Sequence, residues 1–419
     1  MNMQKMGRIC LLLLLAFIFL TIAVSAKEQI ILQVTAWGDH WSITDRIAAF
    51  EQAYPHIKID WQPVPNTGTI VQKIPIMTAT GTAPDVYRIP DANLGNFWNQ
   101  GLSLPIEKLL PTGHTRYFTP GILQDFSWNG VLQGLPQTVS LTMLYYNNDL
   151  FQRYGIAEPR DAGITEIRAA AKKLTIIEGN EYRQWGFEQD GGLHVEYWSY
   201  TMYGGDHTSP DAKVSTYSSP ETIQSLREWV QMVLDGSTIN SSWDKTKFSQ
   251  GLCGMLAGHV GYLSRLFEAH GYTLQNLPFD VRIGRVPKGT TRGQTYATSA
   301  WTIHPHTKYP EEAALFIAWI TSPESQRHFT KAGRGFPTHP AMITPELFAD
   351  WPKDSIPILA AAISEVKLLP IYYSPYYGDW NSVRNNSKLV GPMRNGSMPL
   401  ESTAAELDRI LTPILQGAK

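Results

Sequence analysis

The sequence predicts an α/β fold in which strands and helices alternate around parallel sheets. The first observation is the order of elements over residues 30–87, where strand, helix, strand, helix and strand follow one another. That order is typical of a doubly wound parallel sheet. The second observation is that the same alternation continues along the chain, with no internal repeat, low-complexity tract or long linker. Two lobes, if present, are therefore expected to be interleaved along the chain.

The first unit contains five predicted elements. Buried strands are expected where apolar residues run together, and helices where they recur at a spacing of three to four. Ser42 is a good helix N-cap and Pro55 ends the helix that follows. In order, the prediction is a strand over 30–37, a helix from Ser42 to Tyr54, a strand over 57–61, a helix over 70–79 interrupted by Pro75, and a short strand at Val86 and Tyr87.

The rest of the chain continues the pattern. Pro220 is expected at the first position of a long helix, and Pro310 and Pro323 near the starts of two others. The predicted elements are a β-rich run over 140–147, helices over 165–174 and 220–234, strands over 281–287 and 297–303, helices from Pro310 to Thr321 and after Ser322, and a C-terminal helix over 402–415.

The first 26 residues predict a signal peptide, not part of the fold. Lys5 and Arg8 give a basic start, an apolar run over 9–20 follows, and the small residues before Lys27 fit a cleavage site near Ala26. We therefore expect an exported, periplasmic protein whose mature chain begins at Lys27. An uncleaved N-terminal anchor is the alternative.

Composition excludes several classes. Of two cysteines only Cys253 remains after cleavage, so no internal disulfide is expected and the core must stabilise the protein. The formal charge of -2 argues against nucleic acid, whose binders carry basic stripes. The 13 Trp and 19 Tyr exceed what a core of Leu, Ile and Val needs, and such rings are common in ligand sites.

Ordered landmarks along the mature chain resemble the family of extracellular solute-binding proteins of sugar importers, which includes maltose-binding protein. The chain is similar to that family over nearly its whole mature length. The landmarks are Trp37-Gly38, the segment 50–59, Gly81-Thr82-Ala83-Pro84-Asp85-Val86, the segment 145–151 (Tyr-Tyr-Asn-Asn-Asp-Leu-Phe), residues 169–175, Phe248-Ser249-Gln250-Gly251 with Met255, Pro310-Glu311-Glu312-Ala313, and the segment 321–326.

The resemblance implies two interleaved α/β lobes joined by crossover strands, as in type II periplasmic binding proteins. By similarity, lobe 1 takes residues 27–138 and 292–341, and lobe 2 takes 139–291 and 342–419. A carbohydrate would bind between the lobes, which would close about a hinge. The implied partners are the membrane permease subunits of an ABC importer. We expect a monomer without cofactor or metal and without enzyme activity.

In open α/β sheets, ligands bind beyond the carboxyl ends of the strands. In lobe 1 this rule selects the loops after residues 37 and 86. Sugars need flat aromatic faces and side chains that hydrogen-bond hydroxyls. The candidates are Trp37 for stacking, Asp39 and His40 for hydroxyls, and Arg88 with Asp91 as a polar clamp. A surface role for His40 and a plain ion pair for Arg88 and Asp91 are the alternatives.

The resemblance supplies the remaining candidates, with Trp380 first because Trp380-Asn381-Ser382-Val383-Arg384 resembles the family's cleft tryptophan. A helix-core role for Trp380 is the alternative. The others are Trp198, Tyr262 where the family often carries Trp, Trp301, Arg334 in a late turn, and Tyr373 in a dense aromatic cluster. Acidic residues that maltose-binding protein carries in its cleft have no counterpart here, which argues against maltose in particular.

Three other functions stay open at this point. The motifs of common hydrolases and nucleotide-binding enzymes are missing, but a secreted carbohydrate-active enzyme needs only a carboxylate pair. A ferric-binding protein could use the pairs Tyr145-Tyr146 or Tyr372-Tyr373. Sequons at Asn240, Asn385 and Asn395 would suit a secreted eukaryotic glycoprotein.

Overall fold

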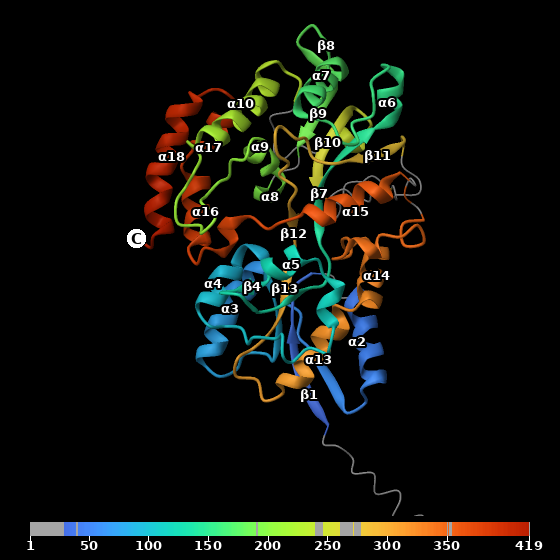
Figure 1. Cartoon of the computed structure of the whole chain (residues 1–419), viewed down its shortest axis with the longest axis vertical. Helices are drawn as coiled ribbons and strands as arrows, with labels where there is room; N and C mark the ends of the chain where they lie inside the picture. Colours follow the sequence, from blue (N-terminus) through green and yellow to red (C-terminus); the bar gives the residue numbers. More distant parts are fainter. Residues whose placement is uncertain are drawn as a thin grey trace, which may run out of the picture.

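Two α/β lobes lie end to end in the computed structural model of the chain (Figure 1). The predicted signal peptide, Asp39, His40, Asn240 and Tyr262 lie outside the described residues. The structure describes residues 29–418 except 39–40, 190–191, 239–245, 260–270, 272–277, 350 and 352–353.

The first lobe is built on a five-stranded sheet in the order β2-β1-β3-β13-β6. Strands β1, β2 and β3 run parallel, while β13 pairs antiparallel with both β3 and β6. The parallel strands follow from the helices that connect them, because a parallel pair requires a crossover. Their bounds are β1 (Ile30–Thr35), β2 (Ile57–Trp61), β3 (Val86–Pro90), β6 (Leu135–Pro136) and β13 (Ser299–Ile303).

Helices cover this sheet and bury its strands against one large apolar core. Pro at the first turn and a serine or threonine cap fix where several of them begin. Thus the Ser322 hydroxyl accepts from Ser325 N before α14. The elements are α2 (Trp41–Ala53), α3 (Thr67–Ala79), η1 (Asp91–Asn93), α4 (Leu94–Asn99), η2 (His114–Tyr117), α5 (Pro120–Asp125), the hairpin β4 (Ser127–Trp128) and β5 (Val131–Leu132), α13 (Pro310–Ile320), α14 (Pro323–Lys331) and η3 (Pro340–Met342).

The second lobe is built on a sheet in the order β11-β7-β10-β9-β8, with β12 also paired to β7. Strand β7 is buried along nearly its whole length, which explains its continuous apolar and aromatic sequence. The bounds are β7 (Ser140–Asn147), β8 (Ile176–Glu178), β9 (Glu181–Gln189), β10 (Cys253–His259), β11 (Val281–Gly284) and β12 (Tyr296–Ala297).

Helices from two distant parts of the sequence pack around the second sheet (Figure 1). The Ser219 hydroxyl caps α10 by accepting from Thr222 N, with Pro220 at the first helical position. The C-terminal α18 packs on α10 and α16. The elements are α6 (Asn148–Arg153), α7 (Ile164–Leu174), α8 (Leu193–Glu196), α9 (Trp198–Thr201), α10 (Pro220–Leu234), α11 (Thr246–Ser249), α15 (Ser355–Glu365), η4 (Pro370–Tyr373), α16 (Tyr377–Asn386), α17 (Val390–Arg394) and α18 (Leu400–Leu415).

The lobes are joined by chain segments that bond to one another at the boundary. Val139 and Phe336 form an antiparallel bridge, and Thr298 Oγ1 donates to the Thr138 carbonyl at 2.8 Å. Thr295 bridges Lys367 in the same region. These bonds connect segments that are far apart in sequence, so the joint is a small hydrogen-bonded layer. The residue limits that the sequence predicts for each lobe stay a prediction.

The predicted fold class is confirmed, and the differences are local. The first helix begins at Trp41, so Ser42 lies inside it and is not its cap. Pro75 does not interrupt α3, which begins at Thr67 after the Asn66 cap. The strand expected to end near Tyr87 continues to Pro90, which places Arg88 within β3.

Candidate functional site

The first group of candidate residues lies where β1 and β3 end. Trp37 follows β1 and bridges Val64, and the Arg88 guanidinium stands 4.7 Å from the centre of the Trp37 ring. Arg88 Nε also donates to Ser299 Oγ at 2.5 Å. The guanidinium is held from two sides, and its planar charge over an indole face is a stable arrangement. Trp37 and Arg88 therefore act as one unit.

Asp91 completes this group at the start of η1. Its carboxylate accepts from Thr298 N and Ala92 N, both at 2.8 Å. Burial raises the pKa of Asp91 to about 6, although these bonds and Arg88 oppose the rise. Burial also lowers the pKa of Arg88 to about 10. Arg88 and Asp91 are thus half-buried charged groups close enough to shift each other's pKa, with Trp37 beside Arg88.

An aromatic row from the C-terminal part of the chain faces Asp91. Tyr372 and Tyr377 meet edge to face at 5.2 Å, and Tyr377 lies 6.3 Å from Trp380. Segments η4 and α16, which carry these rings, pack directly against η1. Burial raises the pKa of Tyr377 to about 12, with a further contribution from the Asp91 carboxylate. The structure therefore brings Trp37, Arg88, Asp91 and Trp380 to the same boundary.

Trp380 is fully buried and lies against charged and polar groups of the second lobe. The Arg384 guanidinium stands 5.9 Å from its ring, and Arg384 in turn bonds Glu196 and the Tyr217 hydroxyl. His207 meets Trp380 edge to face at 6.3 Å. Trp380 also belongs to the first core cluster, so its role in ligand binding stays a prediction and a core role is the alternative.

Tyr373 has a different role from its neighbour Tyr372. Its hydroxyl donates to Asp125 Oδ1 at 2.7 Å, and the Tyr296 hydroxyl donates to Asp125 Oδ2 at 2.8 Å. Leu368 N is the third donor to this buried carboxylate, at 3.0 Å. Burial raises the pKa of Asp125, against the effect of these bonds. Tyr373 thus joins helix α5 of the first lobe to the segment that leads into α16.

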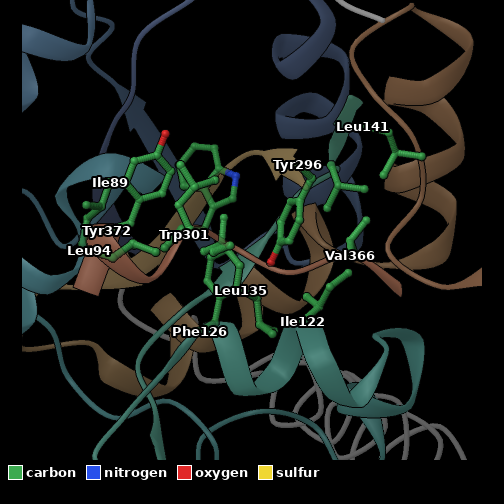
Figure 2. Packing of buried hydrophobic residues seen from close by; sticks show 14 of the residues in the cluster. Ile89, Leu94, Ile122, Phe126, Leu135, Leu141, Tyr296, Trp301, Val366 and Tyr372 are labelled. Atoms are coloured by element: carbon green, nitrogen blue, oxygen red, sulfur yellow. The ribbon is translucent and has the colours of Figure 1, made fainter. Parts of the chain in front are cut away.

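Two predicted ligand residues lie in the cores. Trp301 is fully buried on β13 among Ile89, Leu135 and Tyr372, as Figure 2 shows, and its Nε1 donates to Gln137 Oε1 at 3.0 Å. Trp198 is fully buried in the second core against Phe187 and Trp229. Both rings lie in core clusters, as Trp380 does, and their contact with a ligand stays a prediction.

Arg334 lies in the turn before Gly335, at the bridge that joins the lobes. Its carbonyl accepts from Thr138 Oγ1 at 3.0 Å, and Gly335 has a φ of +131° that disfavours any side chain there. Arg334 is half-buried. Arg334 thus lies at the joint between the lobes, and the predicted ligand contact stays a prediction.

The sequence did not single out His207, Asp125, Asp206 or Tyr377 as site residues. Tyr197 donates to Asp206 Oδ2 at 2.5 Å, and burial raises the pKa of Asp206 to about 6 against the effect of that bond and of Lys367. These residues lie in loops or short helices without a strong period. A motif could not have found them, since only their spatial grouping marks them.

The ferric-binding alternative loses one of its two tyrosine pairs. Tyr145 and Tyr146 are consecutive on β7, so their side chains point to opposite faces of the sheet. Tyr145 belongs to the first core cluster and Tyr146 to the second. Within the described ranges, no cluster of three His, Cys, Asp or Glu side chains has the geometry to hold a metal ion.

A cavity of about 750 Å³ lies in the second lobe, away from the boundary. It is lined by the segment 155–163, one face of α7, Lys288 and Gly289. Its Asp161 is already bonded to Lys288 and Arg292.

In the part of the chain that the structure describes, no helix is both long and apolar enough to cross a bilayer.

Comparisons with known proteins agree with this architecture. Residues 42–327 match the family model of the bacterial extracellular solute-binding proteins. A binding protein of Brucella abortus (strain 2308) is 27% identical over 296 residues, which cover 68% of this chain and 69% of that protein. The maltodextrin-binding protein MdxE of Bacillus subtilis is 23% identical over 256 residues, or 60% of each chain.

Solved structures share the fold at low sequence identity. The sugar-binding protein MalE of Xanthomonas citri superposes with a TM-score of 0.79 at 15% identity, covering 92% of this chain and 98% of its own. An ABC substrate-binding protein of Listeria monocytogenes, solved with cycloalternan, gives 0.76 at 18% identity, covering 93% and 100%. The match to the family model spans well over half of the sequence, and the two-lobed fold agrees with it. The chain belongs to the family of bacterial extracellular solute-binding proteins.

Proposed function

We propose that this protein is the substrate-binding component of a carbohydrate ABC importer, and that it binds a mono- or oligosaccharide between its lobes. The observation that carries the proposal is the aromatic row Tyr372, Tyr377 and Trp380, which lies opposite Asp91 across the boundary. Aromatic faces cover the C–H faces of a pyranose, while carboxylates and guanidinium groups bind its hydroxyls.

The same proposal includes the route of the protein and its partners. Residues 1–26 act as a signal peptide that is removed near Ala26, and the mature monomer works in the periplasm without enzyme activity. The lobes close about the joint when ligand binds, and the closed form delivers the sugar to the membrane permease subunits. Relatives support a saccharide, since MdxE is a maltodextrin-binding protein and the Listeria structure holds cycloalternan.

A thermal-shift screen followed by calorimetry tests the ligand class. The panel contains glucose, tagatose, maltose, maltotetraose, cellobiose and trehalose, and a true ligand raises the melting temperature by mass action. A panel that leaves the melting temperature unchanged throughout argues against a saccharide ligand. Release of reducing sugar during the same incubations would support the carbohydrate-active enzyme instead.

The substitution Trp380→Ala tests the site. Loss of the stacking face should weaken binding by about 1–3 kcal/mol. The matched control is Trp185→Ala, because Trp185 is half-buried on β9 and stacks on Tyr182 at the far end of the second lobe. Equal affinities for Trp380→Ala and wild type in calorimetry would remove Trp380 from the site.

A further inference from the structure

His207 lies in a closed cage of aromatic rings in the second lobe. Tyr200 stands 4.1 Å from the imidazole centre, Tyr217 5.5 Å, and Trp380 6.3 Å. Tyr197 stacks on the imidazole at 5.7 Å with an interplanar angle of 24°. The four rings come from α9, from the segments before α9 and α10, and from α16. The imidazole is fully buried as a result.

Both ring nitrogens of His207 have no hydrogen-bond partner among the described residues, and Trp380 Nε1 has none either. A buried polar group without a partner is costly because it has lost its hydration, so native proteins keep few such groups. Here three such nitrogen atoms lie on two rings in contact, whereas polar atoms in a packed core usually have hydrogen-bond partners within the protein. A ligand that offers hydroxyl groups would satisfy them.

The cage lies on the side of the second lobe that faces the first. The Asp125 carboxylate of the first lobe is near enough to Tyr197 to contribute to its raised pKa, after burial and Asp206. Lys367 stands 5.9 Å from the Tyr197 ring. Trp380, which forms one wall, belongs to the aromatic row opposite Asp91. All four rings of the cage belong to the second lobe, so His207 lies directly behind Trp380, and a sugar reaches its imidazole only when one of these rings turns aside.

We propose that His207 is a specificity-determining residue of the saccharide site, where its imidazole and the Trp380 indole N–H hydrogen-bond hydroxyl groups of the sugar. This inference rests on the proposed function. A neutral imidazole has one donor and one acceptor nitrogen, and a sugar hydroxyl can serve both. Burial, with Arg384 and Arg394 nearby, keeps the pKa of His207 well below its usual value and thus keeps the ring neutral.

The test compares wild type and His207→Phe by calorimetry on maltose and its monodeoxy analogues, or on the analogues of whichever panel sugar binds more tightly. Phenylalanine keeps the ring and removes both nitrogens. The affinity of His207→Phe for the parent sugar should be about tenfold lower than that of wild type, which corresponds to one neutral hydrogen bond. One deoxy analogue should bind both proteins equally, because it lacks the hydroxyl that His207 contacts.

The matched control is His114→Phe. His114 is also buried among aromatic rings, but its Nε2 is bonded to Thr321 Oγ1 at 2.9 Å in the first lobe. This variant should lose stability and keep wild-type affinity. His207→Gln retains a donor and an acceptor. It replaces His207→Phe in the calorimetric comparison if the phenylalanine variant does not fold.

Three outcomes decide the inference. The inference is supported if His207→Phe binds every sugar but one deoxy analogue more weakly than wild type does. A loss of the same factor for every analogue overturns it, because a purely structural role weakens all ligands alike, and so does an unchanged affinity. If wild type binds no saccharide, the proposed function itself has failed. That result differs from equal affinities of wild type and His207→Phe, which overturn only the role of His207.

Discussion

At the scale of single residues, buried carboxylates define the boundary between the lobes. Asp125 receives three donors, two of them hydroxyls of Tyr296 and Tyr373. A carboxylate that accepts several bonds is tolerated in a buried position because each donor replaces part of its lost hydration. Asp125 therefore holds helix α5, strand β12 and segment η4 together.

The substitution Asp125→Ala leaves two buried tyrosine hydroxyls and one amide without an acceptor. We expect the free energy of unfolding to fall by about 2–4 kcal/mol, the sum of partly relaxed unpaired groups. Urea denaturation followed by tryptophan fluorescence measures it. Asp211→Ala is the control, since that carboxylate lies on an exposed turn. A midpoint equal to wild type for Asp125→Ala would show that these bonds contribute nothing to stability.

At the scale of elements, a glycine sets how closely α4 approaches η4. Gly95 packs against the backbone of Tyr373, and a Cβ added there would overlap the Tyr373 carbonyl. Neither partner is a flexible side chain, so the contact cannot adjust without moving one element. The approach of α4 to η4 determines where the aromatic row stands relative to η1.

Gly95→Ala should therefore push η4 away from α4 and displace Tyr372 and Trp380 from Asp91. We expect weaker saccharide binding, by about tenfold, and a lower melting temperature, because overpacking at a rigid contact costs on the order of 1–3 kcal/mol. The matched control is Gly378→Ala in α16, where an added Cβ meets nothing within 4 Å. Equal affinities and melting temperatures for Gly95→Ala and Gly378→Ala would mean that the contact between Gly95 and Tyr373 does not position the aromatic row.

The bounds of a helix or strand were predictable from sequence where nearby residues set them. Bounds that depend on tertiary packing were not. Strand β2 and helix α10 have the predicted bounds because alternation and a Ser-Pro cap act within a few residues. The lengths of β3 and α3 differ because pairing with β13 extends β3, and Asn66 provides a cap before the apolar period begins. Packing of α3 tolerates Pro75 inside the helix, which propensity alone disfavours.

The same distinction holds for the site. Trp37 and Asp91 could be selected because they follow strand ends, and Trp380 because it resembles a family landmark, while their contact with a ligand stays a prediction. The sequence could not show that Trp301 and Trp198 lie in core clusters, because the residue type alone does not reveal which way an aromatic ring points. His207 carries no motif, and only the convergence of Tyr197, Tyr200 and Tyr217 around it reveals its position.

At the scale of the whole molecule, opposing groups titrate over the same pH range. Burial raises the pKa of Asp91 and Asp206 to about 6, so their contribution to stability is present in acid and is lost as the pH rises through 6. Burial lowers the pKa of His114 to about 4 and that of His207 well below 6.5. The histidines therefore contribute stability at neutral pH that is lost in acid. The two effects oppose each other between about pH 4 and 6.5.

Removing one histidine should shift this balance in a defined direction. Arg384 from α16 and Arg394 from α17 lie near His207, so the folded protein resists protonation of the imidazole while the unfolded chain accepts a proton below 6.5. His207→Phe abolishes that difference. Relative to wild type, its free energy of unfolding should increase by up to about 1.4 kcal/mol for each pH unit below 6.5 and stay constant above it. Urea titrations of both ligand-free proteins at pH 8, 6.5, 5.5 and 4.5 give the comparison. Parallel curves would mean that His207 takes up its proton equally well in the folded state, which requires that water reaches the cage.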